Sequence, residues 1–178
     1  MKVGEHDLST NNDDAKLIKV KKIHNHPNYN NPVSLNNDFS ILELDEDLTF
    51  SESVRPACLP QSDASTYAEL DGKSTVCYLL KGIPKKHASI SAVVSGWGTL
   101  SQGGSSPKIL QEITVKVLEN SNCGDIPSAE ITNQMMCATA PNNEAYNGVC
   151  HGDSGGPLVT KLGGRYSFRP LIMELPLF

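Results

Sequence analysis

Short strand-like segments separated by turn residues run along most of this 178-residue chain. Apolar and polar residues alternate over 17–23, 88–94 and 113–117, and 39–44 is an apolar run of strand length. A period of two residues places every second side chain on one face, which is typical of a half-buried antiparallel strand. Only 119–123 is predicted to form a short helix. Many short strands with turns between them predict an all-β fold, either a sandwich or a barrel.

The charge pattern argues against two classes of partner. The formal net charge is -5, and no run of Lys or Arg is longer than two residues. This leaves no basic surface of the kind that binds nucleic acid or anionic membranes. No stretch approaches the roughly 20 apolar residues of a bilayer span. The first seven residues include charged side chains and lack the apolar region of a secretory signal. We therefore expect no nucleic acid and no membrane as partner, and no signal peptide within this chain.

The chain has five cysteines and no C-x-x-C pair, so neither a zinc knuckle nor a thioredoxin-type redox motif is indicated. They are Cys58, Cys77, Cys123, Cys137 and Cys150. An odd count leaves at least one thiol without a partner in the chain. Two interpretations stay open at this point: inert thiols of a cytosolic protein, or the remainder of a disulfide framework from a secreted one.

The residues that indicate chemistry are concentrated in one glycine-rich octet, Cys150–Pro157. The glycines around Ser154 allow a tight turn in which the N–H groups of Gly152 and Ser154 point the same way. Two such donors form a pocket for the oxyanion that develops when a hydroxyl attacks a carbonyl. A glycine-rich turn with a solvated serine is the alternative interpretation of the octet.

Chain order separates two hydrolase families that use such a serine. In an α/β-hydrolase a helix follows the nucleophile, and the acid and the histidine come later in the chain. Here Pro157–Thr160 opens a predicted β-hairpin around Gly163 and Gly164, and no histidine lies downstream of Ser154. This order excludes the α/β-hydrolase interpretation.

A carboxylate placed before the serine fits a different template. Asp38 stands at the start of the apolar run, where a buried carboxylate could accept a hydrogen bond from an imidazole N–H and fix its tautomer. From about Gly4 to Tyr166 the chain resembles the trypsin/chymotrypsin-like serine proteases, peptidase family S1. Three motifs carry this resemblance together with Asp38: Arg55–Pro60, Ser95–Gly98 and Gly152–Pro157.

The resemblance implies two antiparallel β-barrels with the active site between them. It identifies Ser154 as the nucleophile, Asp38 as the orienting acid, and the N–H groups of Gly152 and Ser154 as oxyanion donors. Protein or peptide substrates are then the expected partners, with protein inhibitors of proteases as further ones, and the location is extracellular.

Two further roles follow from the resemblance. Asp153 corresponds to the acid of the zymogen switch, which pairs with the N-terminal ammonium released by activation cleavage. Without that partner we expect its carboxylate to turn outward or to find another donor, leaving the oxyanion pocket unformed. Gly148 and Val149 correspond to the specificity pocket, where an Asp at position 148 would select Arg or Lys.

The catalytic histidine that the resemblance requires is absent. In the family it precedes the acid by on the order of 45 residues, and Asp38 has only 37 residues before it. We expect surface or packing roles for the five histidines present. The resemblance therefore implies a chain truncated at both ends. Residues 1–58 would be the remainder of the first barrel, 59–73 a linker, and 74–178 a second barrel that lacks its C-terminal strand and helix.

The same resemblance interprets the cysteines and one unusual stretch. Cys123 and Cys137 match a family disulfide, and the partner of Cys150 would lie outside the chain. Residues 77–93 interrupt the family pattern and are interpreted as an insertion, either a surface loop or translated intervening sequence. No cofactor is expected. Glu5 matches the start of a calcium-binding loop, but Asn12 and Ala15 replace its later carboxylates, so tight calcium binding is not expected.

Two functions remain. The first is a serine-type endopeptidase, with this chain an inactive fragment for want of its histidine. The second is a non-catalytic protease homologue that binds protein partners. Retention of Ser154, Asp38 and the glycines together favours the first, because a homologue without catalysis has no need to keep them.

Overall fold

A computed structural model of the chain describes residues 1–10, 15–57, 91–118, 120–123, 131–140, 149–162 and 165–170. Within these ranges the only helical element is the 3-10 turn η1 (Asn120–Asn122). The strands are β1 (Lys2–Val3), β2 (Lys16–Leu17), β3 (Val20–Asn25), β4 (Ser40–Leu44), β5 (Ser91–Gly96), β6 (Gln111–Leu118), β7 (Cys137–Thr139), β8 (Pro157–Leu162) and β9 (Arg165–Pro170). The predicted all-β class is therefore confirmed. The described residues contain no helix long and apolar enough to cross a membrane.

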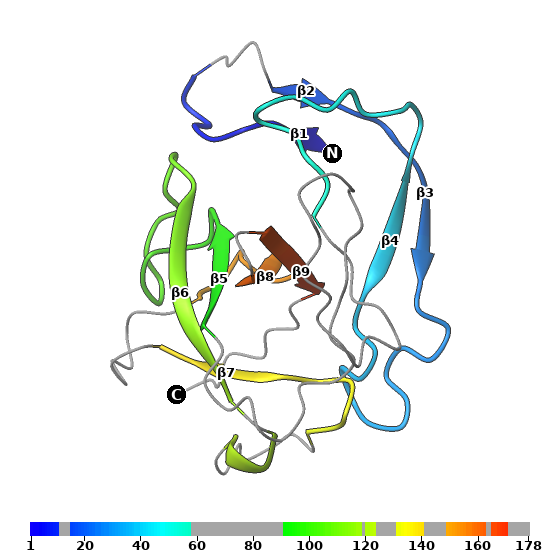
Figure 1. The fold of residues 1–178 in the computed structure, drawn as a ribbon, viewed down its shortest axis with the longest axis vertical. Coiled ribbons are helices and arrows are strands. Elements are labelled where there is room, and N and C mark those ends of the chain that lie inside the picture. The colour runs from blue at the N-terminus through cyan, green and yellow to red at the C-terminus, as the bar shows by residue number, and fades with distance from the viewer. Residues whose placement is uncertain are drawn as a thin grey trace.

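The strands form three antiparallel sheets, in the orders β1-β2, β3-β4 and β7-β6-β5-β8-β9. In Figure 1 the β3–β4 pair lies on the opposite side of the molecule from β5 and β6. The segment after β1 is joined to the segment before β6, where Leu8 donates its N–H to the carbonyl of Lys108 (2.8 Å) and Leu110 donates to the carbonyl of His6 (2.8 Å). All pairing is antiparallel, as in the double-barrel fold that the sequence predicts.

The buried core follows the period-two pattern of the five-stranded sheet. Alternate residues of β5 and β6 face it, and β8 adds its own apolar side chain. Each of these side chains is at most 5% exposed, so they bury nearly all of their apolar surface. The cluster consists of Ala92, Val94, Val115, Val117 and Leu158.

The insertion predicted over 77–93 overlaps a strand. Its last residues, 91–93, form the first half of β5, within the alternation over 88–94 that predicts a strand. Ala92 pairs with Val115 of β6 on one side and with Thr160 of β8 on the other. Buried apolar side chains and two neighbouring strands make this segment part of the sheet. Residues 77–90 lie outside the described part of the chain.

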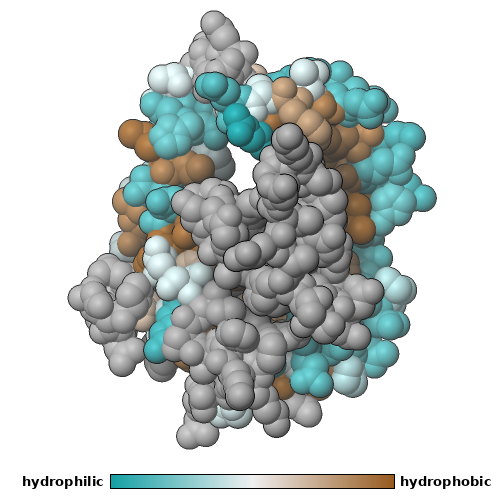
Figure 2. Space-filling model, viewed as in Figure 1, coloured by the Kyte–Doolittle hydropathy of each residue, from teal (hydrophilic) through white to brown (hydrophobic). Residues whose placement is uncertain are grey.

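The β3–β4 sheet is much less covered than the five-stranded sheet. Ile23 is 59% exposed and Ile41 is 63% exposed, although both lie within strands. Hydrophobic side chains reach the surface beside hydrophilic ones in the space-filling view (Figure 2). Apolar side chains on the described part of this sheet are therefore left in contact with water.

Candidate active site

The glycine-rich octet forms two consecutive tight turns before β8. Asp153 donates its N–H to the carbonyl of Cys150 (3.1 Å), and Gly156 donates to the carbonyl of Asp153 (2.9 Å). Gly152 and Gly155 have φ angles of 98° and 78°, a left-handed conformation that glycine adopts without steric cost. Ser154 lies between them and is exposed. The turn therefore presents the serine to solvent.

The Asp153 carboxylate is held by backbone donors. Gly98 donates its N–H to Oδ1 (2.8 Å), and Cys150 donates its N–H to Oδ2 (3.0 Å). The carboxylate has thus found other donors, one of the two outcomes expected for an acid without an ammonium partner. Each bond joins a charged acceptor to a backbone N–H, the stronger class of hydrogen bond.

Two glycines make room for this carboxylate. A Cβ atom at Gly96 would lie 2.0 Å from Asp153 Oδ1, and one at Gly98 would lie 2.4 Å from Asp153 Cγ. We call Gly96 and Gly98 the glycine cradle. From the sequence both glycines are predicted only as part of a family motif, not in this role. Two glycines on either side of the only tryptophan, Trp97, are the signal that could have indicated it.

The turn is fixed against the segment that contains the cradle. Thr99 donates its N–H to the carbonyl of His151 (2.8 Å) and its hydroxyl to the Cys150 sulfur (3.1 Å). A Cβ atom at Gly152 would come within 3.2 Å of the Gly98 Cα. Close backbone approach, in addition to its left-handed φ, therefore requires glycine at position 152.

The N–H groups of Gly152 and Ser154, the predicted oxyanion donors, are not used within the described structure. Neither donates a hydrogen bond to another described residue. Their role as oxyanion donors stays a prediction.

The sequence predicts that Asp38 is a buried carboxylate, and the structure shows it on the surface. Its side chain is exposed and accepts no hydrogen bond from any described residue. The buried residue of this turn is Asn36, which is 1% exposed and two positions earlier. Because β4 begins only at Ser40, Asp38 lies in the turn before the strand, where the described residues do not cover it.

The four described histidines contact residues other than Ser154 and Asp38 or are exposed. His24 Nε2 lies 3.1 Å from Glu43 Oε2, and the ring of His26 packs against Phe39 with its Nδ1 accepting the N–H of Asn28 (3.1 Å). His6 and His151 are exposed. None of the four forms a hydrogen bond with either predicted catalytic side chain, and His87 lies outside the described residues.

The Glu5 carboxylate is held by neighbouring groups in the described structure. Its Oε1 accepts the N–H groups of His6 (2.9 Å) and Asp7 (3.1 Å), and its Oε2 pairs with the Lys2 ammonium. The Lys2 ion pair is the main cause of the lowered pKa of Glu5, and the two backbone N–H groups add to it. The prediction that Glu5 does not belong to a tight calcium site stays a prediction. Asn12 lies outside the described residues.

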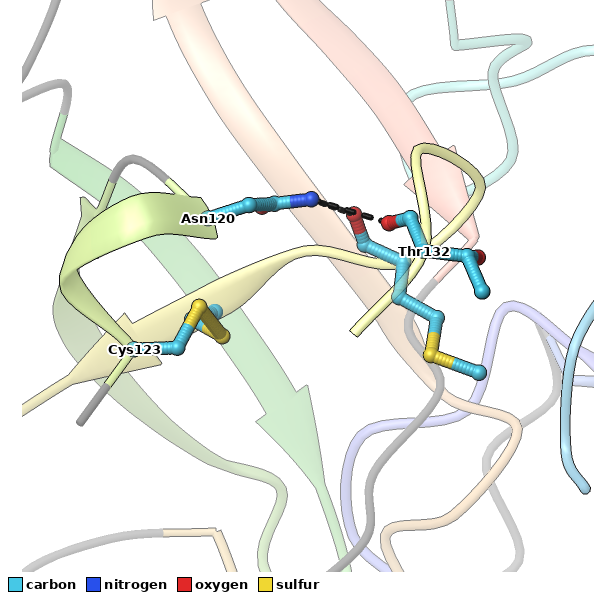
Figure 3. Close-up of a disulfide and its surroundings, with 5 residues drawn as sticks. Asn120, Cys123 and Thr132 are labelled. Atoms are coloured by element: carbon cyan, nitrogen blue, oxygen red, sulfur yellow. Dashed lines mark hydrogen bonds between the residues drawn. A yellow bond between two sulfur atoms is a disulfide. The ribbon is translucent and has the colours of Figure 1, made fainter. Parts of the chain in front are cut away.

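The disulfide between Cys123 and Cys137 is present, with 5.7 Å between the two Cα atoms. Figure 3 shows it next to η1, from which the Asn120 side chain extends toward the turn that contains Thr132. Cys150 is a free thiol in this structure. Val149 packs against the core of the five-stranded sheet, while Gly148 lies outside the described residues.

The chain is similar to known proteins along most of its length. The family model described as Trypsin matches residues 1–170. Trypsin-1 of Astacus astacus is 36% identical over 156 residues, which cover 87% of this chain and 55% of that protein. Serine protease 1 of Rattus norvegicus is 31% identical over 160 residues, covering 89% and 55%. The serine protease filzig of Drosophila melanogaster is 31% identical over 172 residues, covering 92% and 9%. The chain thus spans about half the length of the first and second of these relatives.

Proposed function

The chain belongs to the trypsin family of serine proteases, and from that premise we propose that it derives from a secreted serine endopeptidase that cleaves peptide bonds in protein or peptide substrates. The observation that carries the proposal is the exposed Ser154 on a turn held by Asp153 and the glycine cradle. Protein inhibitors of proteases are a further proposed class of partner.

The proposed chemistry assigns one step to each group. Ser154 Oγ attacks the carbonyl carbon of the substrate, and the oxygen of the resulting tetrahedral intermediate receives hydrogen bonds from the N–H groups of Gly152 and Ser154. Collapse of the intermediate releases the amine and leaves an acyl-enzyme, which water then hydrolyses. Asp38 orients the imidazole that takes the serine proton and delivers it to the leaving amine.

We further propose that the 178-residue chain alone is inactive. Support comes from the four described histidines, none of which hydrogen-bonds to Ser154 or Asp38. A serine hydroxyl without a general base is a poor nucleophile at neutral pH, and the loss of triad function typically lowers turnover by about 10⁴- to 10⁶-fold.

The same observation favours a second candidate, a non-catalytic homologue that binds protein partners. Chemical rescue distinguishes the two. Purified chain is treated with a fluorophosphonate probe at increasing concentrations of free imidazole. A chain that lacks only its base should label at Ser154 faster as imidazole rises, and Ser154→Ala should abolish the labelling.

Ser101→Ala, which changes an exposed turn serine, is the matched control and should leave labelling unchanged. Labelling that is insensitive to imidazole, or that persists in Ser154→Ala, would reject the endopeptidase assignment and support the binding homologue.

A further inference from the structure

We propose that Asn36 is the positioning residue for Asp38, and that Thr132 connects it to the loop closed by the Cys123–Cys137 disulfide. The inference rests on the proposed function only for the role of Asp38. The connection itself is a chain of hydrogen bonds between residues 96 positions apart in the sequence.

The Asn36 side chain is buried and both ends of its amide are used. Its Nδ2 donates to the carbonyl of Asn31 (2.6 Å), and its Oδ1 accepts the hydroxyl of Thr132. Turning the amide over would place two oxygens against each other at Asn31. The bond to Asn31 therefore sets the direction of the second bond, and Thr132 must donate.

The Thr132 hydroxyl is itself held in place. Its oxygen accepts the N–H of Gln134 (3.2 Å) while it donates to Asn36, so the hydroxyl has a partner in each direction. The Thr132 carbonyl accepts Nδ2 of Asn120 (2.9 Å) and the N–H of Met135 (3.1 Å). Figure 3 shows Asn120 reaching across to this turn from the helical turn next to Cys123.

The disulfide closes the segment that contains Thr132. Asn120 also donates to the carbonyl of Met135 (3.1 Å), so one side chain binds two carbonyls of the same turn. With Cys123 joined to Cys137, the turn is restrained both by this amide and by a covalent bond.

Asp38 lies between two fixed points. On one side is Asn36, and on the other is Ser40, which pairs with Asn25 at the start of the β3–β4 sheet. Between them, Phe39 donates its N–H to the Asn37 carbonyl (2.9 Å), and the Phe39 carbonyl accepts the N–H of His26 (3.2 Å). Asn37 Nδ2 donates to the carbonyls of Asn28 (3.0 Å) and Asn31 (3.1 Å). Described residues give the Asp38 side chain no hydrogen-bond partner, so its position depends on this backbone, and Asn36 is the buried residue through which the segment meets Thr132.

Thr132→Val tests the connection, because it removes the hydroxyl with little change of volume. Amide hydrogen exchange at residues 36–40 should become about tenfold faster, the factor expected for losing one net hydrogen bond. The side-chain carboxyl ¹³C signal of Asp38 should shift. Thr132→Ser, which keeps the hydroxyl, should restore both readouts, and Thr114→Val on an exposed position of β6 is the matched control.

Removing the disulfide tests whether the loop that it closes acts on residues 36–40 through Thr132. Cys123→Ser with Cys137→Ser should accelerate exchange at 36–40 in the parent chain and add nothing in the Thr132→Val background. Equal acceleration in both backgrounds, or unchanged exchange in Thr132→Val, would overturn the proposal. If Thr132→Val does not fold, Asn36→Ser removes the same bond from the other side. These readouts need no peptide hydrolysis, so a chain without activity can still confirm the connection, and an active one can still refute it.

Discussion

The glycine cradle yields the sharpest prediction, for the substitution Gly96→Ala. The new methyl group would sit 2.0 Å from Asp153 Oδ1, far inside any van der Waals contact, so the Asp153 carboxylate must move. Moving it breaks the bonds from the N–H groups of Gly98 and Cys150. Hydrogen bonds to a charged group contribute about 1.5–3 kcal/mol each. Asp153 is only partly buried and regains some hydration, so we expect a loss of about 2–4 kcal/mol in the free energy of unfolding.

Urea unfolding measures this loss, with far-UV circular dichroism alongside the fluorescence of Trp97, the only tryptophan and the neighbour of Gly96. Gly103→Ala is the control, because nothing lies within 4 Å of its new methyl group. It should cost only the roughly 1 kcal/mol of a left-handed alanine.

A double-mutant cycle decides the cause. If the cost of Gly96→Ala comes from displacing the carboxylate, then in an Asp153→Ala background the same substitution should cost less than about 0.5 kcal/mol. Additive costs in the two backgrounds would refute the reasoning, because the methyl group would then be destabilising for some other reason.

Three further predictions concern stability. Leu158→Ala, at a side chain 1% exposed, should lower the free energy of unfolding by about 2–5 kcal/mol in urea titrations. Replacing Cys123 and Cys137 by serine should lower it by about 2–4 kcal/mol, measured against the oxidised chain, with no change on adding reductant to the variant. Glu5 has a folded-state pKa below its ordinary value, chiefly because of the Lys2 ion pair, so its contribution is complete above the ordinary value and is lost as the pH falls through the lower one. Glu5→Gln should therefore flatten the fall in stability as the pH drops below the ordinary Glu pKa of 4.5, and an unchanged slope would contradict this.

Much of the fold was predictable because its signals are local. The alternation over 113–117 lies within β6, and the pair Gly163–Gly164 falls between β8 and β9. Period two in a strand and glycine in a turn depend on the residues themselves and their immediate neighbours. The tight turn around Ser154 follows in the same way, since Gly152 and Gly155 allow the left-handed φ angles that the turn requires.

Residues 91–93 lie within the alternation over 88–94, and this local signal predicts a strand although the family pattern is interrupted there. Pairing with β6 and β8 is what makes them a strand, and those partners are distant in sequence.

Sequence alone thus determined the β class, the strand pattern, the tight turn at Ser154 and the Cys123–Cys137 pairing by family resemblance. Tertiary structure alone decided which groups hold Asp153, which side chain of the 36–38 turn is buried, and that Asn36 meets Thr132. The donor from Gly98 is 55 positions from Asp153, and Thr132 is 96 positions from Asn36. No local pattern encodes such pairs, because the partner of a polar side chain is set by how the sheets pack, and burial then requires that the partner be present.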